Sequence, residues 1–177
     1  MIFLRHPRPG IDPGICYGRL DLDIHPDGHA QIKQALAITP AARLVVSSPA
    51  LRCRELAQAI AHRDQLELAF DARLWEMHMG DWEGLPWNDI PRELSDPWLK
   101  DPFNLACPNG ESFRQVQQRV VEALTLHGDD TIVVCHAGPI RAVQMAWCGL
   151  SFADAFASTP PYAEPMQIFR PATKEPQ

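Results

Sequence analysis

Met1-Ile2-Phe3-Leu4-Arg5-His6-Pro7 opens the chain, and this stretch decides how the rest is interpreted. Its apolar start predicts a short buried strand that delivers Arg5 and His6 side by side at its carboxyl end. Ligands of open α/β sheets bind at that edge. Because like charges repel, the charge of Arg5 disfavours protonation of His6, and a neutral imidazole is a nucleophile. An ordinary strand-to-loop turn is the alternative, which these residues alone do not exclude.

Two further apolar runs predict strands, and each is followed by a polar or glycine-bearing turn and then a helix. They are Leu44-Val45-Val46 and Thr131-Ile132-Val133-Val134-Cys135. Apolar residues at three- and four-residue intervals predict helices over 30–38, after Ser48-Pro49, from Ser112 to Leu126 and from about Pro139 to Cys148. This alternation of strands and helices indicates a largely parallel sheet covered on both faces.

The length of 177 residues suits one domain, residues 1–177. Residues 81–110 differ from the rest because they carry five prolines with Trp82, Trp87 and Trp98 between them. We expect them to form a partly helical excursion that packs over one sheet edge as a wall or lid. The last residues, 173–177, are expected to be frayed.

Charge and hydropathy exclude several classes of partner. The net charge of −6 provides no basic field that would attract nucleic acid or an anionic membrane. No segment approaches the length of a transmembrane span, and a strand beginning at residue 2 leaves no room for a signal peptide. A cytoplasmic location is therefore expected, whereas the sequence does not indicate an oligomeric state.

The cysteines and histidines do not predict a metal site. The five cysteines are widely spaced and include no C-x-x-C pair, so we expect reduced structural thiols. His25 and His29 are four residues apart, but no acidic or cysteine partner lies at a zinc-like interval. We expect neither a metal nor a cofactor.

The polar residues after the three predicted strands form a pattern. Arg5-His6 follows the first strand, Ser47-Ser48-Pro49-Ala50-Leu51-Arg52 the second, and Cys135-His136-Ala137-Gly138 the third. Because parallel strands end at one edge of a sheet, two histidines and two arginines would meet there. The N-termini of the helices that follow favour anions. The pattern therefore predicts an anion site.

These residues resemble the signature blocks of the histidine phosphatase superfamily, the phosphoglycerate mutase-like group. The blocks are Arg5-His6; Ser47-Ser48-Pro49 with Arg52; Leu74-Trp75-Glu76 running into Gly80-Asp81-Trp82-Glu83-Gly84; and Val134-Cys135-His136-Ala137-Gly138-Pro139-Ile140-Arg141. They occur in the family's order. The resemblance implies a three-layer α/β/α sandwich with a mostly parallel central sheet, and metal-free phosphoryl transfer through a phosphohistidine.

The resemblance also implies residue roles. His6 would be the nucleophile, Arg5, Arg52 and His136 the phosphate clamp, and Glu76 the proton donor to the leaving oxygen. The chemistry agrees, since two arginines and a cationic His136 would neutralise the equatorial phosphate oxygens, and a leaving alkoxide needs a proton. By analogy with oxyanion donors, losing one clamp donor should cost about 10²–10³ in rate.

The chain departs from the family pattern after the Arg-His pair. Pro7 replaces the usual glycine, so the loop offers one fewer backbone donor to phosphate, and Arg8-Pro9 replaces an acidic-Thr pair. Arg8 is a candidate to compensate or to contact another part of the substrate. Tyr17 and Arg19 occupy the next phosphate-loop segment and are candidate ligand contacts.

Other charged residues near the expected site receive no catalytic role. We expect Glu83 to be solvent-facing or structural and Arg54 to be solvated. Arg141 is basic and near the site, but nothing in the pattern assigns it to the reaction.

The predicted activity is that of a metal-independent phosphomonoesterase acting on a small phosphorylated metabolite. The Tyr17-Gly18-Arg19-x-Asp21 segment resembles that of α-ribazole phosphatases, which suggests α-ribazole 5′-phosphate. A phosphohistidine protein phosphatase, a phosphoglycerate mutase-type enzyme and a non-catalytic phosphate-binding module are the alternatives. The short chain argues against the mutase, which must shield its phosphohistidine from water.

Overall fold

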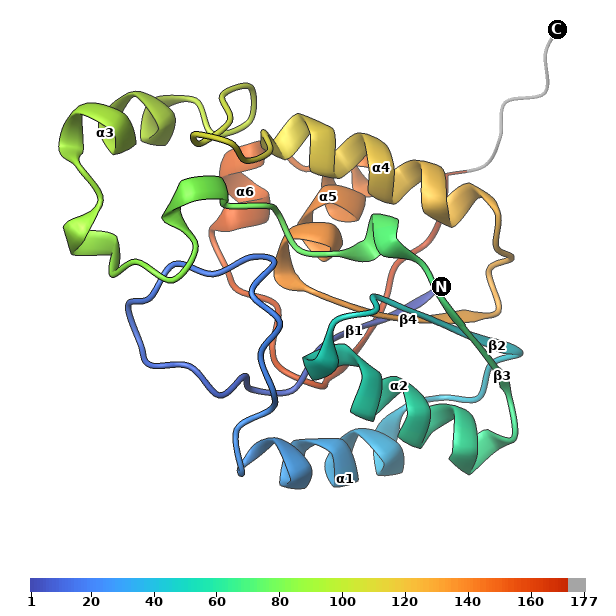
Figure 1. Cartoon of the computed structure of the whole chain (residues 1–177). Helices are drawn as coiled ribbons and strands as arrows, with labels where there is room; N and C mark the ends of the chain where they lie inside the picture. Colours follow the sequence, from blue (N-terminus) through green and yellow to red (C-terminus); the bar gives the residue numbers. More distant parts are fainter. Residues whose placement is uncertain (172–177) are drawn as a thin grey trace, which may run out of the picture.

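A five-stranded sheet in the order β3-β2-β4-β1-β5 forms the centre of the protein in the computed structural model, which describes residues 1–171 (Figure 1). Its strands are β1 (Ile2–Arg5), β2 (Leu44–Ser47), β3 (Glu67–Phe70), β4 (Thr131–Cys135) and β5 (Pro165–Gln167). Strand β5 is antiparallel to β1, and the other pairings are parallel. Strands β1, β2 and β4 were predicted, whereas β3 and β5 were not. The expectation for residues 173–177 lies outside the described residues.

The register of the sheet places the polar strand ends level with one another. Arg5 pairs with Cys135, and Ser47 pairs with Val134. The backbone N–H of His6 then donates to the Cys135 carbonyl at 2.9 Å, and that of Ser48 to the Val134 carbonyl at 2.9 Å. The residues that follow β1, β2 and β4 therefore share one edge of the sheet.

Helices cover both faces of the sheet, which confirms the predicted three-layer α/β/α class (Figure 1). Helices α1 (Gly28–Ile38) and α2 (Leu51–Asp64) lie on one face. Helices α4 (Phe113–Thr125) and α5 (Ala137–Cys148) lie on the other, with the short α6 (Phe152–Phe156) beside α5. Ser112, which directly precedes the apolar periodicity, caps α4 in a capping box: its side chain accepts from the backbone N–H of Gln115, and the Gln115 side chain accepts from the backbone N–H of Ser112.

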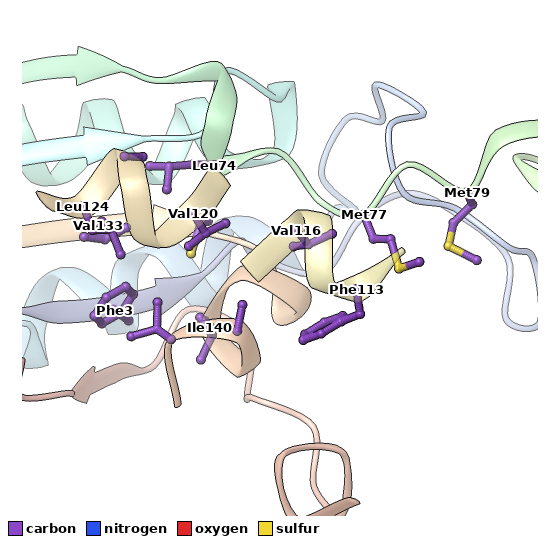
Figure 2. Packing of buried hydrophobic residues seen from close by; sticks show 14 of the residues in the cluster. Phe3, Leu74, Met77, Met79, Phe113, Val116, Val120, Leu124, Val133 and Ile140 are labelled. Carbon is purple, nitrogen blue, oxygen red and sulfur yellow. The ribbon is translucent and has the colours of Figure 1, made fainter. Parts of the chain in front are cut away.

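The alternation of side chains along β1 divides the core into two layers. Phe3 packs with Val116, Val120 and Ile140 beneath α4 and α5, as Figure 2 shows. The neighbouring Leu4 points to the opposite face and joins the cluster beneath α1 and α2. Both residues are completely buried, so the start of the chain is fixed between two packed layers.

The Pro/Trp-rich segment contains two single turns and one helix. They are η2 (Gly80–Trp82), η3 (Trp87–Asp89) and α3 (Arg92–Lys100). The segment hydrogen-bonds to the loop after β1, since the N–H of Cys16 donates to the Leu85 carbonyl and that of Trp87 to the Gly14 carbonyl. The segment is partly helical, as expected, and its Trp87 and Trp98 line a cavity together with Arg5 at the carboxyl end of β1.

No helix within residues 1–171 is long and apolar enough to cross a membrane. All five cysteines are free thiols, as their spacing predicts. The remaining turn, η1 (Ala72–Leu74), follows β3 and leads directly into Trp75 and Glu76.

Candidate active site

His6 lies immediately after β1 and is 1% exposed. Its Nδ1 lies 2.7 Å from the Pro7 carbonyl oxygen. Because a carbonyl only accepts, Nδ1 carries the hydrogen and Nε2 holds the lone pair. Burial lowers the pKa of His6 well below its usual value, and the charges of Arg52 and Arg5 lower it further. The like-charge effect predicted from the Arg-His pair is therefore present, although burial is the larger cause.

Arg5 is anchored through both terminal nitrogens. Nη1 donates to the Pro160 carbonyl at 3.1 Å, and Nη2 donates to the Tyr162 hydroxyl at 3.1 Å. The guanidinium also lies over the Tyr162 ring, 3.9 Å from its centre. These contacts leave Nε buried and without a partner among the described residues.

Arg52 is held in the same way from the first turn of α2. It is completely buried, and its Nη1 and Nη2 donate to the Leu20 and Gly18 carbonyls, each at 2.7 Å. Again Nε is buried and finds no partner within residues 1–171. Both guanidinium groups are thus held through their terminal nitrogens, and in each the buried Nε–H has no partner among the described residues.

His136 follows β4, and its ring centre lies 5.1 Å from that of His6. Its Nε2 lies 2.8 Å from the Ser48 hydroxyl, while Nδ1 is buried without a partner in the described chain. Burial, and then the charge of Arg52, hold its pKa well below the usual value. Full burial and the two neighbouring guanidinium charges therefore disfavour the cationic form of His136 that the sequence suggested.

Glu76 approaches the N-terminus of α5. Its Oε1 accepts from the backbone N–H of Gly138 at 3.1 Å and from that of Met77 at 2.9 Å. A Cβ on Gly138 would lie 2.1 Å from Oε1, so only glycine permits this approach. The Glu76 carbonyl in turn accepts from Arg119 of α4 at 3.0 Å. The absence of a side chain at Gly138 therefore lets the Glu76 carboxyl group reach the N-terminus of α5.

A cavity of about 280 Å³ lies beside these groups and is lined by Arg5, Glu76 and Gly138, together with Tyr17. Burial and then the nearby Tyr162 raise the pKa of Tyr17 to about 12, so its hydroxyl is a neutral hydrogen-bonding group. Trp87 and Trp98 from the Pro/Trp-rich segment also line the cavity.

Two of the predicted contact residues lie away from this cavity. Arg8 pairs with Asp27 at 3.0 Å and lines a neighbouring hollow instead. Arg19 pairs with Glu111 at 3.1 Å and lines neither space. Of the three candidates in this part of the chain, only Tyr17 lines the cavity that Arg5 and Glu76 also line.

Three charged residues that were given no catalytic role make other contacts. Glu83 is structural, since its carboxylate accepts from four backbone N–H groups. Arg54 is exposed and donates to the Pro49 carbonyl. Arg141 lines the cavity, where its guanidinium donates to the carbonyl of Ala155 in α6 and to that of Ser158 in the loop that follows.

Several supporting residues could not be chosen from the sequence. Tyr162 lies far along the chain from Arg5, in a segment without a motif, and only the fold brings the two together. Arg119 looks like any polar residue of an amphipathic helix, yet it binds the carbonyls of Arg73, Trp75 and Glu76. Ser48 belongs to the signature block Ser47-Ser48-Pro49. Its position one residue beyond β2 was the sequence signal that could have identified it as a site residue.

No group of three or more metal-ligating side chains occurs in the part of the chain that the structure describes.

The arrangement therefore combines a buried imidazole with a free Nε2, nearby guanidinium and imidazole donors, and a carboxyl group in the cavity that Arg5 also lines. The sequence model of the histidine phosphatase superfamily (branch 1) matches residues 1–166, and the chain belongs to this family. The predictions of this family and of a phosphoric monoester hydrolase are confirmed.

Named relatives include phosphatases with different substrates. The chain is 29% identical over 161 residues to phosphoserine phosphatase 1 of Hydrogenobacter thermophilus, covering 85% of this chain and 76% of the relative. It is 32% identical over 172 residues to the glucosyl-3-phosphoglycerate phosphatase of Mycobacterium tuberculosis, covering 87% and 77%.

Solved structures share the fold. A mycobacterial glucosyl-3-phosphoglycerate phosphatase superposes with a TM-score of 0.77 at 27% identity, over 90% of this chain and 84% of that one. The α-ribazole phosphatase from Shigella flexneri superposes with a TM-score of 0.80 over 92% and 86% of the two chains. Its identity is 22%, so that likeness concerns the fold alone.

Proposed function

We propose that the chain hydrolyses a phosphomonoester through a phosphohistidine on His6, without a metal ion. One observation carries the proposal: Arg5 Nε, Arg52 Nε and His136 Nδ1 are buried nitrogens that lack acceptors within residues 1–171. Buried donors are normally paired, so three of them around one imidazole indicate an external acceptor. A phosphoryl group supplies three equatorial oxygens for this purpose.

The donor role of His136 depends on its tautomer. When the Ser48 hydroxyl donates to Nε2, the hydrogen of the neutral ring lies on Nδ1. A neutral His136 can then bind phosphate as a hydrogen-bond donor while the two arginines supply the charge. A bound anion would also favour protonation of the ring, which would strengthen this contact.

The first step breaks the ester bond. His6 Nε2 attacks phosphorus, the bond from phosphorus to the leaving oxygen breaks, and a protonated Glu76 gives its hydrogen to that oxygen. The Nδ1–H of His6 remains hydrogen-bonded to the Pro7 carbonyl, and this bond stabilises the positive charge that develops on the ring.

The second step restores the enzyme. The Glu76 carboxylate takes a hydrogen from water as the water oxygen attacks the phosphohistidine. The bond from phosphorus to nitrogen breaks, and inorganic phosphate leaves. Glu76 suits this exchange because both oxygens are oriented by the Gly138 N–H within the cavity lining.

The substrate we propose is a small phosphorylated metabolite, with α-ribazole 5′-phosphate as one candidate. The resemblance of the Tyr17-Gly18-Arg19-x-Asp21 segment supports that candidate. The names of the relatives give phosphoserine and glucosyl-3-phosphoglycerate as their substrates. Both compounds should therefore be tested beside α-ribazole 5′-phosphate.

Trapping the intermediate tests the mechanism. The protein is mixed with ³²P-labelled phenyl phosphate in the presence of EDTA and quenched in base. We expect acid-labile, base-stable label on the wild type and on His62→Ala, an exposed histidine of α2, but none on His6→Ala. Label on His6→Ala would overturn the nucleophile assignment.

Steady-state hydrolysis of p-nitrophenyl phosphate covers the other outcomes. We expect turnover that EDTA does not reduce. Activity that EDTA abolishes would contradict the metal-free mechanism, and phosphate binding without turnover would make the chain a binding module.

A further inference from the structure

The cavity beside Glu76 has an apolar wall that the phosphoryl chemistry does not require. Its floor and sides are formed by Met77, Met79, Trp87, Trp98, Phe113 and Phe156. Met77, Met79 and Phe113 are buried, whereas Trp87 and Phe156 are 42% and 38% exposed and stand at the open side. A ligand that enters would therefore pass between two aromatic rings and rest on side chains that carry no charge.

This cavity is the space open to the leaving group. The leaving oxygen must lie next to Glu76 to receive a proton, and Glu76 lines this cavity but not the neighbouring hollow beside Arg8. The alcohol attached to that oxygen consequently extends toward the Met and Trp side chains. The Arg8 hollow would meet the site only from the side of Tyr17 and Tyr162.

The cations of the cavity are already bound. Among the described residues that line it, Arg5 and Arg141 are the cationic ones, and Arg5 is part of the phosphate clamp. Arg141 donates through Nε to the Ala155 carbonyl at 3.2 Å and through Nη2 to the Ser158 carbonyl at 3.0 Å. Its guanidinium also lies over the Phe156 ring at 4.3 Å. The Nε/Nη2 edge of the guanidinium, one of the two edges that could bind a carboxylate bidentately, is therefore occupied by backbone carbonyls.

We propose that the alcohol released by this enzyme carries a flat apolar group and no second anionic group. The inference rests on the proposed function and narrows its substrate class. Phosphoserine and glucosyl-3-phosphoglycerate both bear a carboxylate, which would enter a mostly apolar cavity beside Glu76, where the Nε/Nη2 edge of Arg141 is already bound to backbone. α-Ribazole 5′-phosphate, whose alcohol is neutral and carries an aromatic ring, satisfies both conditions.

A set of primary alkyl phosphates tests the proposal, because their leaving oxygens are chemically alike. Values of kcat/KM are compared for ethyl phosphate, 2-phenylethyl phosphate, phosphoserine and 3-phosphoglycerate. We expect 2-phenylethyl phosphate to exceed ethyl phosphate by about tenfold through aromatic contacts, and both carboxylates to fall below ethyl phosphate. A carboxylate that equals or exceeds 2-phenylethyl phosphate would overturn the proposal and make Arg141 its binding residue.

Variants of the Pro/Trp-rich segment locate the effect. Trp87→Ala should lower the preference for 2-phenylethyl over ethyl phosphate about tenfold, whereas Leu94→Ala, exposed on α3 and outside the cavity, should leave that ratio unchanged. An unchanged ratio in Trp87→Ala would refute the aromatic wall. If the wild type neither hydrolyses ethyl phosphate nor becomes labelled on His6, the proposed function itself is refuted.

Discussion

Gly138 shows how one missing side chain sets the position of a reacting group. The residue lies in the first turn of α5, and its N–H donates to both Glu76 oxygens at 3.1 and 3.2 Å. Since a Cβ would come within 2.1 Å of Oε1, any larger residue must displace the carboxyl group. The backbone there is helical, so the requirement comes from the close approach and not from backbone conformation.

Gly138→Ala should therefore remove proton donation selectively. We expect kcat for ethyl phosphate to fall about 10²-fold, the usual contribution of a general acid. For p-nitrophenyl phosphate, whose leaving group departs without a proton, the loss should stay below about tenfold. Gly128→Ala is the matched control, because a Cβ there meets nothing within 4 Å. Equal losses on both substrates would mean that Glu76 is not the proton donor.

Local sequence identifies some residues of the site and cannot identify others. The Arg5-His6 pair and the residues after β2 and β4 could be identified because each directly follows a short apolar run. The protonation of His136 could not, because it depends on complete burial and on Arg52, and neither is visible in the local sequence. Tyr162 and Arg119 were missed for the same reason, since their partners lie far away in the chain.

At the scale of elements, the loop of residues 18–20 is what holds Arg52 in place. Its Gly18 and Leu20 carbonyls accept from Arg52, while the N–H groups of the same residues donate to Glu83 at 2.9 and 3.1 Å. Burial raises the pKa of Glu83, but the backbone donors outweigh it and leave the pKa below its usual value. One carboxylate from the Pro/Trp-rich segment therefore orders the loop that orients the clamp.

Glu83→Gln should loosen that loop, because an amide nitrogen would face backbone donors in place of an oxygen. We expect phosphate affinity and kcat/KM to fall about tenfold or more, with a loss of about 1–3 kcal/mol in the free energy of unfolding. Isothermal titration with inorganic phosphate and urea unfolding measure the two effects. Glu93→Gln on exposed α3 serves as the control. Unchanged phosphate affinity in Glu83→Gln would show that Glu83 does not control the position of Arg52.

Burial explains which elements were predictable. Strand β4 is buried at all five positions, so its sequence is a continuous apolar run. Strand β3 is an edge strand with exposed Glu67 and Phe70, and β5 has three residues and begins at Pro165. Edge strands need fewer apolar residues, and a proline at a strand start obscures the signal. The sequence pattern therefore predicted the centre of the sheet and missed both edges.

For the whole molecule, the two buried histidines couple folding to pH. Both have pKa values well below the usual value, so the folded protein binds fewer protons than the unfolded chain as the pH falls below about 6.5. Stability is therefore fully present above that pH and is lost as the pH falls toward the folded pKa values. Glu83 and Glu111, whose pKa values are also lowered, add a similar loss only nearer their own usual range.

Between about pH 6.5 and 5 the histidines should thus dominate, each adding up to about 1.4 kcal/mol per pH unit to the slope of unfolding free energy. We expect His6→Asn to reduce that slope by about half in urea unfolding, because one of the two protons is no longer taken up on unfolding. His62→Asn, the same substitution at an exposed position, is the matched control. The Met1 amine, whose pKa is lowered by burial, also contributes as the pH falls below about 8, and it does so equally in all three proteins. A wild-type slope in His6→Asn would show that His6 titrates in the folded protein as it does in the unfolded chain, and the nucleophile would then lose its neutral form below about pH 6.5.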